Sequence, residues 1–452
     1  MPDYSHDLPE NYYFGGGGDT LIPPIAMAAL ILAIILMMSL PRKYAVIPFL
    51  FAGLLIPLNV SIVIESLHFN SNRLLLLAGL SRLIGRREWY PDKMNALDKI
   101  VLYGLLVQSI AYILVWRQAG AIVNRAGFLF SALGTYIFLR SLIRSKEDVV
   151  LVIKVLAVVV LLVAPLMWYE YINLRNPFSL LGAPEFSYIR NNLARAQGPF
   201  AHSIVAGTVG AVLIPLFIGL WWYRPRTWFV SAIGVVSSMV MIISSSSNTP
   251  LMSLPAGILA LSIWPLRENM RIVRRGIVAI LVSVQLVMMA PIWFLIDRVS
   301  DVLGGSGYHR AMLIDTFVRH FFDWFLIGTR DNPNWGYYMF DVDNAYVAAG
   351  LEGGLPGLIL FLAIFVYGYR MVGEARSAAE ESRGDARFIW AIGSALFANS
   401  IAFFGIVYFD QSVIVWYDLL VIISVVYTAA LAEKCSRCDP ETAVPIPVAW
   451  YD

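Results

Sequence analysis

The stretch Leu21–Leu40, LIPPIAMAALILAIILMMSL, contains no charged residue. A transmembrane helix needs about 20 predominantly apolar residues, so this stretch is long enough to cross a bilayer. The whole 452-residue chain is similar in character, with 59% hydrophobic and 14% charged residues and a mean hydropathy of +0.69. In soluble domains about a quarter of the residues are charged. The composition therefore predicts an integral membrane protein that crosses the bilayer many times.

Further apolar segments follow along the chain, and each is expected to be a helix that crosses the membrane. The run Leu74–Ile84 is too short to cross alone, but together with Ser66–Arg73 it is long enough for a tilted or partly buried helix. We therefore predict an all-α, polytopic protein with about 12 or 13 transmembrane helices in a single membrane domain, residues 1–452. The other segments are 44–64, 98–116, 121–143, 148–168, 201–222, 227–246, 250–265, 275–296, 355–371, 388–409 and 411–432.

The orientation follows from the rule that short cytoplasmic loops are rich in Lys and Arg. Most of the 33 Lys and Arg residues fall in alternate loops, which are assigned to the inner side, and the acidic N-terminus then lies outside. This alternation is consistent only if the Leu74 region crosses, which favours 13 helices. Two long outer loops result, at residues 169–200 and 297–354. The cations left on the outer side are all arginine, the residue that grips phosphate or carboxylate with two parallel hydrogen bonds.

The second outer loop concentrates ionisable residues in a chain that is otherwise largely apolar, so the chemistry is expected there. Residues 311–327 have the pattern of an amphipathic helix at the membrane surface. Arg319 pairs with Asp315 at the i, i+4 spacing, whereas Arg310 has no such partner and is the stronger phosphate candidate. His309 and His320 are three helical turns apart. The ionisable residues of the loop include His309, Arg310, Arg319, His320, Asp341 and Asp343.

The first outer loop leads into a membrane segment through the sequence Arg190-Asn-Asn-Leu-Ala-Arg195-Ala-Gln-Gly198-Pro-Phe-Ala-His202. Gly198 and Pro199 interrupt the chain just before the helix, so Arg195 is expected near a helix N-terminus at the membrane surface. Such an N-terminus together with arginine favours anion binding. Alternatively, the arginines anchor the helix at lipid headgroups.

The segment Asp341-Val-Asp343-Asn344-Ala-Tyr346 precedes another membrane helix and has two further interpretations. An acid before Asn is also typical of a helix N-cap. The two carboxylates could instead hold Mg²⁺ or Mn²⁺, although two acids are a weak metal signature. A polar turn, Ser244–Pro250, is predicted to line the same cavity. Asp418, within the last apolar segment, is expected to face the cavity or to pair with an arginine.

These residues together resemble the bacterial O-antigen ligase and O-antigen/exopolysaccharide polymerase superfamily. The motifs cover roughly residues 190–365, and the hydropathy pattern covers the whole chain. They are short, so the resemblance rests on their order, their spacing and the large loop between late membrane helices. They read Arg195-x-x-Gly198-x-Phe200-x-His202, Ser306-Gly-x-x-Arg310, Phe325-Leu-Ile-Gly328, Asp343-Asn-x-Tyr346 and Glu352-x-Gly-Leu-x-Gly357.

The resemblance implies a metal-independent, inverting glycosyltransferase of the bacterial inner membrane, with its active site facing the periplasm and without a cofactor. Its substrates would be a glycan donor on undecaprenyl pyrophosphate and a glycan acceptor. Asp343 or His309 would be the catalytic base, and arginines would bind the pyrophosphate. The ligases carry His-Asn where this chain has Asp343-Asn344, which favours a polymerase, and many members carry an arginine where this chain has Asn248. The pyrophosphate-binding candidates are Arg195, Arg310, Arg190 and Arg319, with His202, His320, Asp341, Asn344 and Tyr346 in support.

Membrane lipid and a chain-length regulator are further expected partners, and no nucleic acid is expected. Aromatic residues of the outer loop could stack on sugar faces, namely Trp324, Trp335, Tyr337, Tyr338 and Tyr346. Three other functions stay open: an O-antigen ligase that transfers finished glycan to lipid A core or protein, a transporter or flippase, and a metal-dependent glycosyltransferase that uses Asp341 and Asp343. Transporters commonly show inverted repeats and broken helices at matching positions, and neither is evident in this sequence.

Overall fold

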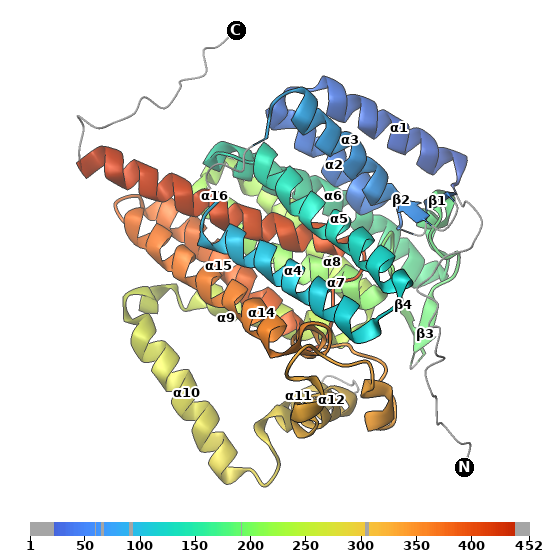
Figure 1. Ribbon diagram of the computed structural model, residues 1–452. Coiled ribbons are helices and arrows are strands. Elements are labelled where there is room, and N and C mark those ends of the chain that lie inside the picture. Colours follow the sequence, from blue (N-terminus) through green and yellow to red (C-terminus); the bar gives the residue numbers. More distant parts are fainter. Residues whose placement is uncertain are drawn as a thin grey trace.

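A computed structural model describes residues 22–58, 60–64, 67–89, 94–190, 192–302 and 307–438 (Figure 1). Within these ranges the protein is almost entirely helical, and two short antiparallel hairpins form its only sheets. The all-α, polytopic class predicted from the sequence is therefore confirmed. The acidic N-terminus and Ser306, both used in the sequence interpretation, lie outside the described residues.

Each predicted apolar segment contains a helix, but the predicted segment 44–64 is helical only as far as Leu55 and ends in a short β-strand. The first six are α1 (Pro24–Ser39), α2 (Arg42–Leu55), α3 (Ser71–Gly85), α4 (Ala96–Trp116), α5 (Ala119–Leu142) and α6 (Lys146–Asn173). The next are α7 (Ser203–Tyr223), α8 (Trp228–Ser245), α9 (Asn248–Ser262), α10 (Met270–Val287), α11 (Leu295–Val302), α12 (Tyr308–Arg319), α13 (Phe321–Trp324), α14 (Ala345–Ala378), α15 (Arg383–Ala402) and α16 (Ser412–Cys438). The hairpins pair β1 (Ser61–Ile64) with β2 (Leu67–Asn70) and β3 (Tyr188–Arg190) with β4 (Leu193–Arg195).

In the described chain, seven helices are long and apolar enough to cross a membrane, or eight if the bent pair Trp264–Val287 and Ile292–Ser300 counts as one crossing. This number is smaller than the predicted 12 or 13. The other predicted segments did become helices, but α1, α2, α3 and α9 have only 14 to 16 residues, and α15 does not meet the same criterion. Length excludes the four short helices, because a full crossing needs about 20 residues, whereas α15 has 20 residues and is excluded by its composition.

Two predicted helices in the second half of the chain are interrupted. The predicted crossing 275–296 ends at Val287, and the next helical segment turns away by 95°. Figure 1 shows α10 set apart from the bundle, and none of its residues is buried. The predicted amphipathic helix 311–327 is broken at His320 into α12 and α13, where Phe317 and Trp324 stack with ring centroids 3.9 Å apart. This stacking stabilises the break, because the chain must fold back to bring the two rings together.

Helix α7 lies at the centre of the bundle and packs against α6, α8, α9 and α15. Small residues allow this close approach, as is common between membrane helices. A Cβ on Gly207 would lie 2.3 Å from the Ser245 hydroxyl, and a Cβ on Gly210 would lie 2.9 Å from the Ser238 carbonyl oxygen. The first turns of α7 are thereby held against the last turns of α8. The end of the bundle formed by 174–202, 244–249, 307–344 and 403–411 is called the loop end below.

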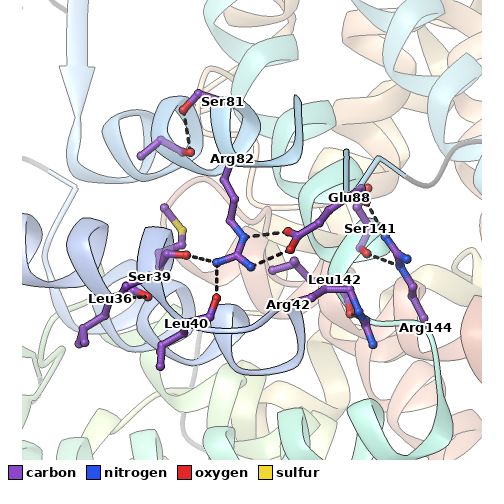
Figure 2. Close-up of polar contacts among 12 residues, drawn as sticks. Leu36, Ser39, Leu40, Arg42, Ser81, Arg82, Glu88, Ser141, Leu142 and Arg144 are labelled. Atoms are coloured by element: carbon purple, nitrogen blue, oxygen red, sulfur yellow. Dashed lines mark hydrogen bonds and ion pairs between the residues drawn. The ribbon is translucent and has the colours of Figure 1, made fainter. Parts of the chain in front are cut away.

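A buried arginine fixes the opposite end of the bundle (Figure 2). Arg82 near the end of α3 is fully buried and donates to both carboxylate oxygens of Glu88 at 2.8 Å. The same guanidinium donates to the carbonyls of Met37 and Leu40 at the end of α1. One paired charge therefore joins the α1–α2 connection to the end of α3, which spans the bundle from the β1–β2 hairpin to this opposite end.

Helix α14 begins ten residues before the predicted crossing and is broken at Gly354, whose φ of 64° and ψ of −166° are open to glycine alone. The loop after α13 is hydrogen-bonded to this break. Leu355 N donates to Phe325 O at 2.8 Å, and Thr329 N donates to Leu351 O at 2.9 Å. The motifs Phe325–Gly328 and Glu352–Gly357 are therefore the two halves of one backbone junction.

This junction is tested by comparing two glycines of the same helix. In Gly354→Ala the new Cβ would lie 2.5 Å from Leu326 O, so the free energy of unfolding should fall by about 1–3 kcal/mol from backbone strain, or more with the clash. In Gly373→Ala no atom lies within 4 Å of the new Cβ, so stability should stay the same or rise by up to ~1 kcal/mol. Denaturant unfolding in detergent would measure both. Equal stabilities of the two variants would contradict the junction.

Candidate functional site

Arg195 is a buried arginine without an acidic partner. It ends strand β4, is 7% exposed, and donates from Nη2 to the Ser247 hydroxyl at 2.9 Å. Its Nε is buried without a hydrogen-bond partner, and no ion pair of Arg195 occurs among the described residues. Burial lowers the pKa of the guanidinium, and the nearby charges of Arg190 and Arg310 lower it further. An isolated buried charge is costly, so this position favours a bound anion.

The segment between Arg195 and His202 is fixed by hydrogen bonds to Glu170, which lies in the last turn of α6. This carboxylate is fully buried and accepts from Gln197 N at 3.0 Å, Gly198 N at 2.8 Å and the Ser187 hydroxyl at 2.9 Å. Gly198 itself adopts φ 58°, with Met167 only 2.9 Å from where its Cβ would lie. The predicted interruption at Gly198 is thus a tight turn that is fixed by a buried acid.

Two residues between α15 and α16 hold the other side of this turn. Asp410 accepts from Ala201 N at 2.9 Å, and Gln411 donates to Pro199 O at 2.6 Å. Both are buried, and burial raises the pKa of the Asp410 carboxyl despite its hydrogen bonds. Asn176 completes the support by donating to Gly198 O at 2.8 Å. The position of Arg195 and His202 therefore depends on residues from three distant parts of the chain.

Arg310, the third residue of α12, is the second buried arginine at the loop end and is 8% exposed. Its Nε donates to Asp343 Oδ2 at 2.9 Å, and its Nη2 donates to the Thr249 hydroxyl at 3.1 Å and to Gly405 O at 3.2 Å. Unlike Arg195, Arg310 is therefore paired with a carboxylate, that of Asp343. The guanidinium also lies against the backbone of Gly405, where a Cβ would approach it to 3.0 Å.

The two arginines meet on the polar turn between α8 and α9. Ser247 binds Arg195, and Thr249, two residues further along, binds Arg310. Ser203, the first residue of α7, lies 3.3 Å from Ser247, hydroxyl to hydroxyl. Two guanidiniums and a helix N-terminus therefore converge on one turn, which is a suitable arrangement for a polyanion.

Asp343 and Asn344 have different roles although they are adjacent. Asn344 is the N-cap of α14: its Oδ1 accepts from Tyr346 N and Val347 N at 2.9 and 3.1 Å. Asp343 therefore does not cap the helix. Its Oδ2 binds Arg310, and its Oδ1 is buried without a hydrogen-bond partner. Burial raises the pKa of the Asp343 carboxyl above its ordinary value, and Arg310 opposes this only in part.

Several of the remaining predicted residues of the two outer loops lie around this centre. His309 lies near it: its Nε2 donates to the Asp341 carbonyl at 3.0 Å, and its charge acts on the Asp343 carboxyl. Asp341 is exposed, and its charge acts on both Asp343 and His202. Arg190 is exposed in the β3–β4 hairpin, close enough for its charge to act on Arg195.

Arg319 and His320 are not brought to the two buried arginines. Arg319 is 74% exposed and pairs with Asp315 at 2.7 Å. His320 stacks on Trp335 with ring centroids 4.6 Å apart, and its Nδ1 donates to Thr316 O. It is ten residues beyond Arg310, about 15 Å along a helix. Both therefore serve the local packing of the second loop.

The aromatic residues predicted to stack on sugars differ in their burial. Tyr346 donates its hydroxyl to Ser400 O at 2.8 Å and packs among Phe361, Phe365 and Phe404. Trp324 is 3% exposed in the core of the second loop. Tyr337 and Tyr338 remain exposed. Asp418 is buried in α16, and neither carboxylate oxygen has a hydrogen-bond partner in the described chain, so the predicted pairing with an arginine is not seen there.

Sequence reasoning missed Glu170 and Asp410. Both are acids at the ends of apolar segments, where a buried carboxylate has to satisfy backbone N–H groups; this position was their only signal. Thr249 lies in the polar turn that was predicted to line the site. Among the described residues no group of three His, Cys, Asp or Glu side chains could hold a metal ion. In the Asp-x-Asp pair, Asp341 is exposed.

No family model matches this chain, and no curated protein matches it at a significant level.

The support from Glu170 can be tested by Glu170→Gln. An amide presents N–H groups to the backbone donors of Gln197 and Gly198, so at least one hydrogen bond to a charged acceptor is lost, at a cost of about 1.5–3 kcal/mol. Protease cleavage within 186–202 should become faster in detergent. Glu185→Gln is the matched control, since that side chain is exposed in the same loop, and should change stability by no more than ~0.5 kcal/mol. Identical cleavage of both variants would contradict this role.

Proposed function

We propose that this protein is a polysaccharide polymerase, which joins oligosaccharide repeat units carried on undecaprenyl pyrophosphate. The observation that carries the proposal is the buried Arg195, which has no acidic partner and lies beside the second buried arginine, Arg310. Such a pair suits a ligand with two linked phosphates, because each planar guanidinium can bind two oxygens. The apolar helices around the loop end suit the polyprenyl chain of the same ligand.

The two arginines would also supply most of the catalysis. The sugar C1 is already activated by its pyrophosphate leaving group, so the protein mainly has to position the substrates and stabilise the departing charge. Donors that are fixed before the reaction do this well, because they need no reorganisation. The hydroxyls of Ser247 and Thr249 hold both guanidiniums at fixed positions.

Asp343 is the proposed base. Its Oδ2 is held by Arg310, while Oδ1 is free to accept the proton of the attacking sugar hydroxyl. A base has to lie within hydrogen-bond reach of that hydroxyl, which an unpaired oxygen beside the pyrophosphate site allows. His309 is the alternative base: its Nε2 donates to Asp341 O, so Nδ1 is the nitrogen that could accept a proton in the neutral ring.

Asp343-Asn344 favours a polymerase over a ligase, because the ligases that this sequence resembles carry His-Asn at this position. The proposed location is the bacterial inner membrane with the loop end on the periplasmic side. This follows from the positive-inside rule, because Arg42, Arg82, Arg144 and Lys146 gather at the other end of the bundle.

Substitution of the two arginines tests the function. In cells that depend on this protein, Arg195→Gln or Arg310→Gln should lower polymer at least about 100-fold, the usual cost of one donor to a developing anion, while single lipid-linked repeat units accumulate. Arg319→Gln should keep normal polymer, because that side chain is exposed and paired with Asp315. Gel analysis of the glycan and an immunoblot of the membrane fraction provide the measurement. Normal polymer from both site variants would refute the proposal, and accumulation of full-length lipid-linked polymer would indicate a ligase.

The role of Asp343 predicts the pH dependence. The carboxylate can accept a proton only above its pKa, which burial raises, so kcat of the purified enzyme should fall as the pH falls through that pKa. Asp343→Asn should lower kcat by about 10²–10⁴-fold. Asp343→His should retain part of the activity, with its loss on acidification moved to about pH 6.5. An unchanged pH profile in the His variant would show that another group is the base.

A further inference from the structure

His202 lies beside Arg195 and has a fixed tautomer. Its Nδ1 accepts from Ile204 N at 3.1 Å, as the N-cap of α7. A ring nitrogen can accept only if it carries no hydrogen, so in the neutral ring the proton is on Nε2. In the described chain, Nε2 itself has no hydrogen-bond partner.

The charges around the ring keep it neutral. Burial and the Arg195 guanidinium lower the pKa of His202 to about 4, and Asp341 opposes this in part. The positive end of the α7 dipole also disfavours an imidazolium, and protonation of Nδ1 would break the cap. These groups come from the three elements around the ring: β4, the segment before α14, and α7 itself. Near pH 7, His202 is therefore an uncharged donor of one N–H.

The ring is also held in place next to the arginine. Ser203, which follows His202, and Arg195 both contact the hydroxyl of Ser247. On the other side, Asp410 fixes the preceding residue by accepting from Ala201 N. His202 is thus fixed at a helix N-terminus, where anions are favoured, beside a buried cation without an acidic partner.

We propose that His202 binds the pyrophosphate of the lipid-linked donor through Nε2–H, as a neutral donor that completes the site begun by Arg195. The inference rests on the proposed function and names one more substrate-contacting residue of the same site. A third positive charge next to Arg195 and Arg310 would raise their mutual repulsion in the free enzyme. A neutral N–H adds a hydrogen bond to phosphate without this repulsion.

Two substitutions separate the cap from the donor. In His202→Asn the amide can still cap α7, but nothing replaces Nε2–H. In His202→Gln the amide nitrogen can reach the position of Nε2, while the cap is weakened. With purified full-length protein in detergent, the probe is inorganic pyrophosphate and the measurement is its Kd by calorimetry. His202→Asn should unfold at the wild-type temperature but bind about 10-fold or more weakly, the effect of one hydrogen bond to a charged group. His202→Gln should bind closer to wild type and unfold at a lower temperature.

The result that would overturn the inference is wild-type pyrophosphate affinity in His202→Asn, or Gln binding no better than Asn in folded protein. If Arg195→Gln still abolishes binding in that case, the proposed function survives without this role for His202. If the wild type does not bind pyrophosphate at all, both fail. An independent signature is the ¹⁵N spectrum of histidine-labelled protein at pH 7, with the His202 signals assigned by their loss in His202→Asn. Protonation at Nε2 alone is expected, and a proton on Nδ1 would refute the assignment.

Discussion

The site depends on the hydroxyl-bearing turn between α8 and α9, which holds two like charges close together. Ser247 and Thr249 each accept a hydrogen bond from a buried guanidinium, and the two arginines come from loops more than a hundred residues apart. Burying a guanidinium is costly unless its hydrogen bonds and its charge are both satisfied. The turn satisfies part of the hydrogen bonding but none of the charge. An anionic ligand is the group that would complete the arrangement.

The turn can do this only because buried acids fix the chain that carries Arg195. Glu170 and Asp410 are neither catalytic nor paired with cations in the described chain; they accept from backbone N–H groups of residues 197–201. Those groups belong to no helix or strand, and would be unsatisfied in an apolar bundle without such acceptors. The end of α6 and the connection between α15 and α16 thereby determine where the first outer loop places its ionisable side chains.

This division explains what the sequence could predict. Apolar length and the interruption at Gly198 predicted the helices and the position of Arg195, because both are local properties. Glu170 and Asp410 were not predicted, since the backbone N–H groups of residues 197–201 that they bind lie 27 or more residues away, and no local pattern encodes that pairing. The sequence could not place Tyr346 for another reason: an aromatic side chain suits a sugar platform and a buried core equally well. Only the three-dimensional packing distinguishes the two.

The balance of charge at the site explains why an aspartate suits position 343. Arg310 is buried in the free protein, and a carboxylate at 2.9 Å neutralises it, whereas a neutral imidazole there would leave two buried guanidiniums without any acid. With Asp343 ionised and His202 neutral, Arg195, Arg310 and Asp343 together carry one positive charge. A net positive charge at the site is consistent with the proposed pyrophosphate ligand. Asn344 makes this possible by capping α14 itself, which leaves Asp343 free to face the arginine.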